Sequence, residues 1–390
     1  MKRPILIGVA AVLAIAAFGF FGIAPAAVEA GMNRVVPAPL PHVTPQTRAL
    51  HASLAIADMH ADTLLWRRNL LDRANRGQVD LPRLQAGNVA LQVFSSVTKT
   101  PRHQNYDANG ADSDNITLLA IAQAQPPRTW GSLLQRSLWH AEKLDRAAAA
   151  SGGALRVIRS PADLDRLLAD RAAGRKVTGG LLSIEGLQDL EGNPANLDRL
   201  HAAGFRMAGF AHFFDNEAAG SMDGQAKGRL TPLGRQVLRR METLGMIVDV
   251  AHASHTAVAD IIAMARRPVV SSHGGVQATC KVNRNLTDDE IRGIARTGGV
   301  VGIGYWEAAV CSTSPKAIAA AIAHVRDLVG IDHVGLGSDF DGAVTTGFDA
   351  SQLVVVTQAL VDRGFSEQEI AKVMGGNVLR VLKAGMGRTS

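Results

Sequence analysis

The chain has 390 residues, of which 47% are apolar, enough for one large domain or two ordinary ones around a substantial core. Its formal net charge is +6, but the basic residues are spread along the chain among acidic ones. Because no basic run is interleaved with aromatic residues, the sequence argues against a nucleic-acid partner.

The N-terminus has the pattern of a targeting segment. Lys2 and Arg3 precede an apolar run over residues 5–23, and small residues follow up to Ala30. A short positive region, an apolar region and small-x-small cleavage options are typical of a secretory signal. The run is also close to the length that spans a bilayer. We therefore expect residues 1–30 to be a signal peptide or an N-terminal membrane anchor. The body would be exported, to the periplasm or another extracytoplasmic space.

Residues 31–50 are rich in proline and show little periodicity, so we expect a linker there and a folded domain over residues 51–385. Beyond the linker, strand-like runs alternate with helix-like runs. Eight runs are apolar and mostly β-branched, as strands buried on both faces of a parallel sheet are. They cover Ser53–Asp62, Asn88–Ser95, Val177–Glu185, Phe205–His212, Met246–His252, Pro268–His273, Gly299–Trp306 and His333–Asp339.

Helix-like runs lie between these strands, and several have clear starting signals. Thr231-Pro232 and Ser314-Pro315 each place a cap residue before a proline at the first helical position. Thr287 opens a capping box with Glu290. Eight β/α units predict an α/β fold, a (β/α)8 TIM barrel, in which active sites form at the carboxyl ends of the strands. The long stretch 96–176 is expected to be an insertion over that end.

Residues that can bind a metal ion or a proton stand at the predicted strand ends. His60 and Asp62 end the first strand, and residues i and i+2 of a strand point to the same face. Others end later strands: Glu185, His212, His252, His273 and Asp339. Each alone has a simpler explanation, such as a core histidine, a helix cap or a salt-bridge partner. Together they predict one pocket, because a barrel brings all its strand ends together.

The best ligands in this set carry nitrogen or oxygen donors, which suit zinc, or manganese and cobalt. They are His60, Asp62, Glu185, His252 and His273. These are too many for one tetrahedral catalytic site that must keep an open position. Two metal ions bridged by a carboxylate fit better, and such pairs share a bridging hydroxide as the nucleophile.

Cys280 and Cys311 are the two cysteines of the chain. In an exported protein they favour one disulfide, which would close a loop of about 30 residues and contribute roughly 3–4 kcal/mol. Two free buried thiols are the alternative.

Six short motifs, in this order, resemble those of the membrane (renal-type) dipeptidases, peptidase family M19. They are Asp58–Asp62, Ser183–Gly186, Asp249–His252, Ser272-His273, Arg284-Asn285 and Gly337–Gly342. The resemblance covers about residues 50–385. It implies a barrel of the metal-dependent hydrolase type with two zinc ions, which cleaves dipeptides, and it suggests a homodimer.

Carried over residue by residue, the resemblance assigns roles to the strand-end residues. It implies one zinc ion on His60 and Asp62, the other on His252 and His273, and Glu185 bridging the two. Asp339 matches the family's acid/base, and His212 matches a histidine that contacts the substrate near the scissile carbonyl. Arg284 matches the arginine that holds the substrate carboxylate, although it could instead be a surface charge beside a helix cap.

Other positions agree with the family in part. Cys280 and Cys311 match positions joined by a disulfide in mammalian members, whereas the segment after His212 lacks the cysteine that those members carry there. The loops around Tyr106 and Trp306 have no clear counterpart, which leaves the preferred dipeptide open.

Two other functions remain open on the sequence alone. A binuclear amidohydrolase acting on a lactam, a lactone or another amide would use the same residues. An exported binding protein would hold its metal for structural reasons, but the acid/base expected at Asp339 argues against that interpretation.

Overall fold

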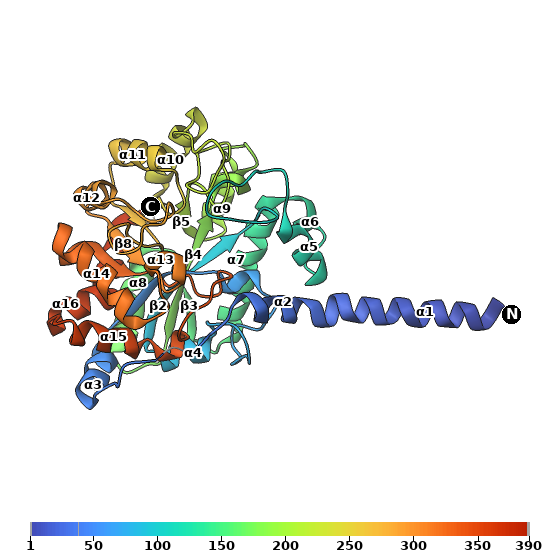
Figure 1. Ribbon diagram of the computed structural model, residues 1–390, viewed down its shortest axis with the longest axis horizontal. Coiled ribbons are helices and arrows are strands. Elements are labelled where there is room, and N and C mark those ends of the chain that lie inside the picture. Colours follow the sequence, from blue (N-terminus) through green and yellow to red (C-terminus); the bar gives the residue numbers. More distant parts are fainter. Residues whose placement is uncertain (1, 38, 388–390) are drawn as a thin grey trace.

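The computed structural model describes residues 2–37 and 39–387, and its centre is a closed barrel of eight parallel strands (Figure 1). Around the barrel the order is β1-β2-β4-β5-β6-β7-β8-β9, and β9 pairs with β1 to close the ring. The strands are β1 (Ile56–Ala61), β2 (Val89–Val97), β4 (Thr178–Glu185), β5 (Phe205–Gly209), β6 (Ile247–Asp249), β7 (Val269–Ser271), β8 (Val300–Ile303) and β9 (Val334–Leu336). The predicted (β/α)8 fold is confirmed.

These strands are buried along nearly their whole length, which explains their apolar sequences. One hydrophobic cluster joins residues of several strands to the C-terminal helix α17, and a larger cluster packs the outer helices on the barrel. All eight predicted strands exist, but most end two or three residues earlier than expected. A ninth, β3 (Leu155–Val157), was missed because it is too short to show a pattern; it pairs with the start of β4.

Helices surround the barrel (Figure 1). Those of the first half are α3 (Pro45–Ser53), α4 (Leu81–Ala86), α5 (Asn115–Ala122), α6 (Arg128–Gly131), α7 (Leu133–Ala150), α8 (Pro161–Ala172) and α9 (Asn196–Ala202). Those of the second half are α10 (Pro232–Leu244), α11 (His255–Met264), α12 (Asp288–Arg296), α13 (Glu307–Val310), α14 (Pro315–Val329), α15 (Val354–Asp362), α16 (Glu367–Ala371) and α17 (Asn377–Gly385). The predicted caps are present: Thr231 and Ser314 accept from backbone N–H groups, and Thr287 forms a capping box with Glu290.

The N-terminal residues form one long helical rod that projects from the barrel (Figure 1). It consists of α1 (Lys2–Phe18), a π-helical turn (Gly19–Ile23) and α2 (Ala24–Met32). By length and composition, Ile5–Met32 is apolar enough to cross a membrane. This agrees with either a signal peptide or an anchor.

The segment expected to be a linker, residues 31–50, is not an extended tether. Its last residues, from Pro45 to Leu50, belong to α3, which begins after the cap residue Thr44 and packs on α15. Thr44-Pro45 is the same starting signal that marks α10, so the sequence did contain the information. Proline is frequent in irregular chain, but Pro45 occupies the first position of the helix, which proline favours.

The stretch 96–176 holds α5 to α8 and β3, and part of it covers the barrel end, where Thr100, Tyr106 and residues of α5 line a cavity. Cys280, in the loop after β7, and Cys311, directly after α13, form a disulfide, as the sequence favoured.

Candidate active site

The barrel brings the candidate residues together at its carboxyl end. His60 lies within β1, Asp62 directly follows it, and Glu185 is the last residue of β4. The others follow β5, β6, β7 and β9 by two or three residues: His212, His252, His273 and Asp339. All of these side chains are buried. The residues named from the sequence therefore lie together at one end of the barrel, although several stand on loops rather than on strands.

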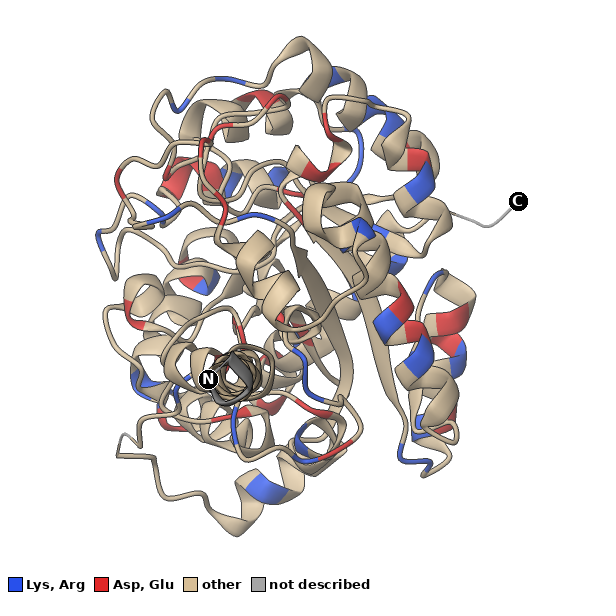
Figure 2. Cartoon of the chain, turned by 90° about the vertical axis from the view of Figure 1, so that its right-hand side faces the viewer, with Lys and Arg blue, Asp and Glu red and all other residues tan. Residues whose placement is uncertain are grey.

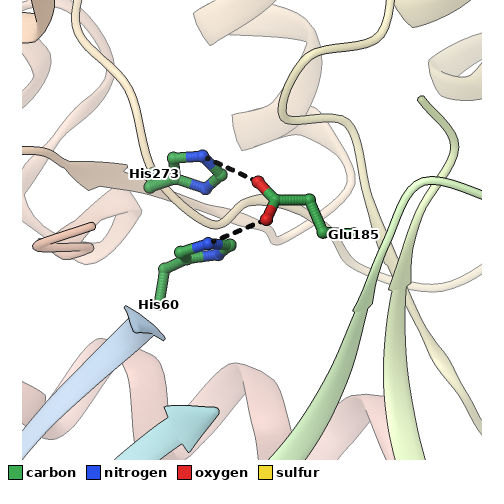
Figure 3. Close-up of side chains that lie close together, drawn as sticks. All are labelled: His60, Glu185 and His273. Atoms are coloured by element: carbon green, nitrogen blue, oxygen red, sulfur yellow. Dashed lines mark ion pairs between the residues drawn. The ribbon is translucent and has the colours of Figure 1, made fainter. Parts of the chain in front are cut away.

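Glu185 lies at the centre of the cluster, and its two carboxylate oxygens face different histidines (Figure 3). Oε2 lies 3.5 Å from Nε2 of His60. Oε1 lies 3.1 Å from Nε2 of His252 and 3.4 Å from Nε2 of His273. Nε2 of His60 is in turn 3.4 Å from Oδ1 of Asp62. The carboxylate thus stands between a His60–Asp62 pair and a His252–His273 pair.

Several of these donor atoms make no hydrogen bond to any residue that the structure describes. Nε2 of His60, Oδ1 of Asp62 and Oε2 of Glu185 are buried and unpartnered. Because a buried polar atom without a partner costs about 1–3 kcal/mol, such a concentration indicates that the atoms bind something other than protein. Their nitrogen and oxygen donors fit a divalent metal ion.

Three overlapping sets of side chains among the described residues could each hold a metal ion. They are His60, Glu185 and His273; Glu185, His212 and His252; and His60, Asp62 and Asp339. Since His60 and Glu185 each occur in two sets, the donors form one continuous cluster rather than separate sites. The cluster offers more ligand atoms than one metal ion binds in a tetrahedral catalytic site.

Two polar groups behind the histidines were missed from the sequence. Nδ1 of His252 is 3.6 Å from Oδ2 of the buried Asp223, whose carboxylate oxygens have no other partner. Nδ1 of His273 is 2.9 Å from the hydroxyl of Ser272. Partners of this kind fix the ring orientation of a metal-binding histidine. The position of Ser272 next to His273 in the sequence could have indicated this contact. Asp223 lies in a long loop with no recognisable pattern, so its contact with His252 could not be predicted.

Two further buried carboxylates join neighbouring strand ends. Asp58 accepts hydrogen bonds from the N–H groups of His60 at 3.0 Å and Ser338 at 3.1 Å. Asp249 accepts from the N–H of Ser272 at 2.9 Å. Asp58 thereby joins β1 to the chain after β9, and Asp249 joins β6 to the chain after β7. Both belong to motifs noticed in the sequence, but nothing there revealed this positioning role.

Asp339 and His212 stand at the edges of the cluster. Oδ1 of Asp339 is 3.8 Å from Nε2 of His60, and Asp339 holds a left-handed backbone with φ of 60°. Burial raises its pKa well above the ordinary value, and the Asp62 and Glu185 carboxylates add to the shift. Nε2 of His212 is 3.6 Å from Oε1 of Glu185, and burial lowers the pKa of His212 to about 3. His212 is therefore uncharged at neutral pH.

Arg284 is 2% exposed, so its interpretation as a surface charge is wrong. Its Nη2 donates to the carbonyl oxygen of His273 at 3.1 Å, and its buried Nε has no partner. A Cβ on Gly274 would lie 3.0 Å from Nη1, so glycine makes room for the guanidinium. Arg284 thus presents a fixed positive charge beside the cluster.

A cavity of about 510 Å³ opens over these residues, within the range of about 300–1,000 Å³ that is common for small-molecule sites. The candidate residues that line it are Asp62, Glu185, His212, His252, His273, Arg284 and Asp339. Tyr106, Phe213 and Trp306 line it as well, which gives the two unassigned loops a place at the site. Residues of α2 and α5 complete the walls.

Comparison with known proteins agrees with this geometry. The model of the family described as membrane dipeptidase (peptidase family M19) matches residues 44–386. The chain is 31% identical over 363 residues to the dipeptidase aclJ of Aspergillus oryzae, covering 87% of this chain and 80% of that protein. It is 30% identical to the dipeptidase tcpJ of Claviceps purpurea, covering 79% and 69%.

Solved structures share the fold. The probable dipeptidase PvdM from Pseudomonas aeruginosa is similar with a TM-score of 0.74 and 22% identity, covering 87% of this chain and 97% of that one. A metallopeptidase from Rhodobacter sphaeroides, solved with a phosphinate mimic of the dipeptide L-Ala-D-Ala, has a TM-score of 0.67 and 23% identity, covering 85% and 99%. The chain therefore belongs to the membrane dipeptidase family, peptidase family M19, and is a hydrolase of this metallo-dipeptidase type.

Proposed function

We propose that this enzyme hydrolyses dipeptides with the help of two zinc ions. One ion would be held by His60 and Asp62, the other by His252 and His273, and Glu185 would bridge them. The observation that supports this most strongly is the position of Glu185, whose two oxygens face the two pairs at 3.1–3.5 Å. When bound, the ions would activate a water molecule as the nucleophile and polarise the scissile carbonyl.

His212 is proposed to stabilise developing negative charge during the reaction, and Asp339 is proposed to transfer a proton. His212 lines the cavity next to Glu185 and would donate a hydrogen bond to the carbonyl oxygen as negative charge develops there. Asp339 lines the cavity next to His60. Its carboxylate would take up a proton from the attacking water and deliver it to the nitrogen of the leaving amine.

Arg284 is proposed to bind the C-terminal carboxylate of the substrate. A guanidinium can donate two parallel hydrogen bonds to a carboxylate, and Arg284 has donors left over after its single bond to His273. Because its position is fixed by burial, it would sit at a set distance from the reacting carbonyl. The enzyme would thereby select substrates of two residues.

Export to the periplasm or another extracytoplasmic space is also proposed, on the basis of the apolar N-terminal helix. The catalytic domain would occupy residues 51–385 of the exported part. Assembly as a homodimer rests on the family resemblance alone.

A substrate panel tests the proposed reaction. The zinc-loaded protein is offered a dipeptide, the same dipeptide with an amidated C-terminus, the tripeptide that extends it, and a lactam and a lactone. We expect hydrolysis of the free dipeptide, and far slower reaction of the amide and the tripeptide, because neither places a carboxylate at Arg284. Hydrolysis of the lactam or lactone without the dipeptide would favour another amidohydrolase activity instead.

A further inference from the structure

The end of the N-terminal rod is fastened to the barrel by buried charges. Glu29 of α2 is 1% exposed and forms ion pairs with Arg68 and with Arg76, whose Nε lies 2.8 Å from Oε2. The side chain of Arg68 is itself 3% exposed and also pairs with Asp341. Removing one partner of a buried ion pair strands the other charge and is strongly destabilising. Glu29 is therefore built into the folded domain.

The residues after α2 continue this attachment along the loop that follows β9. The N–H of Val36 donates to the carbonyl oxygen of Thr346 at 2.9 Å. The N–H of Ala343 donates to Oδ1 of Asn33 at 2.8 Å. Asp339, the candidate acid/base, is the third residue of this loop. The N-terminal segment thus packs on the same loop that carries a residue of the active site.

Part of the rod also lines the active-site cavity. The lining residues from this segment are apolar: Phe20, Ala24, Pro25, Val28 and Met32. Further apolar lining comes from α5 and from the turn after β1: Leu65, Trp66, Ile116, Leu118 and Leu119. The polar cluster around Glu185 lines the same cavity. The cavity consequently has a polar part, where the reaction takes place, and an apolar part to which the rod contributes.

Cleavage at the signal-like site would take this wall away. A cut after Ala30 would remove Glu29 together with Phe20 and Val28, leaving Arg68 and Arg76 without their shared partner. Figure 2 shows the rod end-on, in front of the rest of the chain. A retained rod would place the mouth of the cavity next to the membrane.

We propose that residues 20–36 stay in the mature enzyme as a fixed wall of the substrate pocket, held by Glu29, and that this wall selects dipeptides with large apolar side chains. The selection rests on the proposed dipeptidase function, whereas retention of the segment does not. The apolar helix that precedes the wall then serves as an uncleaved membrane anchor.

The chain offers a closely matched pair of variants. Phe20 lines the cavity, whereas the adjacent Phe21 is not among the described residues that line it. The full-length protein, with a C-terminal tag, is purified from membranes in detergent as wild type, Phe20→Ala, Met32→Ala and Phe21→Ala. The intact mass of each gives its N-terminus. The values of kcat/KM for Phe-Phe and Gly-Gly give the preference for apolar side chains.

We expect an intact mass that includes residues 20–36. In Phe20→Ala and Met32→Ala, the ratio of kcat/KM for Phe-Phe to that for Gly-Gly should fall about tenfold, the effect of losing part of an apolar pocket. In Phe21→Ala it should stay within about twofold. An N-terminus beyond Glu29, or equal ratios in all four proteins, would overturn the inference. A wild-type protein that cleaves neither dipeptide would overturn the selection and the proposed function, while the mass would still decide whether the segment is retained.

Discussion

Glu185 determines how the two halves of the histidine cluster relate to each other. One oxygen faces His60, and the other faces His252 and His273. Without a bound cation, its buried carboxylate and that of Asp62 would stand close together and repel each other, and burial with this repulsion raises the pKa of Asp62 to about 6. Divalent ions would offset the repulsion between the Glu185 and Asp62 carboxylates, and they would bind the donor atoms that make no hydrogen bond to the described residues. The residue geometry therefore supports metal binding independently of any relative.

Asp339→Asn tests the acid/base role of this residue. Asparagine keeps the shape of the side chain but cannot take up the proton, so kcat should fall by about 10²- to 10⁴-fold, the usual contribution of general acid–base catalysis. Hydrolysis rates and metal content, by mass spectrometry of the metal, are measured together. Metal content should stay near the wild-type level, since Asp339 is not among the proposed ligands.

Two results would contradict that role. A rate within a few-fold of wild type would remove Asp339 from the chemistry. A large loss of metal along with the rate would make it a ligand instead, consistent with its place in one of the three possible metal-binding sets. The control Asp362→Asn changes the same functional group on α15, away from the cavity lining, and should affect neither quantity.

At the level of single residues, the sequence predicted the positions that share a simple rule. His60, Glu185 and His273 stand at or just after strand ends, and the barrel makes such residues neighbours. Asp223 follows no such rule, because it reaches His252 from a loop whose path depends on tertiary packing. The burial of Arg284 could not be predicted either, because it depends on which segments cover the loop after β7.

The strands themselves are shorter than their apolar runs suggest. β6 and β7 have three residues each, yet the chain stays buried as far as His252 and His273. An apolar run in the sequence indicates where the chain is buried. Here the chain stays buried in the loops beyond the last hydrogen bond between neighbouring strands. His252, with φ of 64°, shows why the ladder must stop: a left-handed residue cannot continue a strand. The eight barrel strands could be predicted, but their exact ends and the short strand β3 could not.

α3 shows how the element before β1 is tied to the barrel. His51 is buried, with Nδ1 2.8 Å from Oγ1 of Thr357 on α15 and Nε2 3.2 Å from the carbonyl oxygen of Gly87. Burial lowers the pKa of His51 from 6.5 to about 4. The folded protein therefore keeps this ring neutral in a pH range where the unfolded chain protonates it.

His51→Gln tests this attachment through the pH dependence of stability. Between pH 6.5 and 4 the unfolded wild-type chain binds a proton at His51 that the folded protein does not, so stability falls as the pH falls through this window. The shift corresponds to about 3 kcal/mol. Glutamine does not titrate, so urea unfolding at pH 7 and pH 4.5 should show a smaller loss in the variant.

His42→Gln is the control, because His42 is exposed and should leave the pH dependence as it is in wild type. If His51→Gln lost as much stability on acidification as wild type does, His51 would not be a buried neutral histidine. α3 would then be less firmly packed on α15 than the structure indicates.

On the scale of the whole molecule, the closed barrel and the rod together form the active-site cavity. The barrel gathers residues from positions 60 to 339 at the carboxyl ends of its strands, and α2 closes one side of the resulting cavity. The sequence predicted the barrel from its eight-fold alternation and the rod from its hydropathy. It did not predict that the two meet, since Glu29 and Arg68 show no pattern that pairs them.

The most direct test of the account is a zinc titration of the metal-depleted protein. Full-length enzyme is stripped with a chelator and dialysed, zinc is added stepwise, and bound zinc and dipeptide hydrolysis are measured on the same samples. Glu185→Gln and the exposed-site control Glu217→Gln are treated in parallel.

We predict no hydrolysis without metal and full activity when two zinc ions are bound per chain, with Glu217→Gln behaving as wild type. Glu185→Gln should fail to hold both ions and stay inactive, because it lacks the charge that joins the two halves of the site. Full hydrolysis by the stripped enzyme, or a Glu185→Gln variant that binds two ions and cleaves dipeptides normally, would contradict the binuclear site on which the proposed function depends.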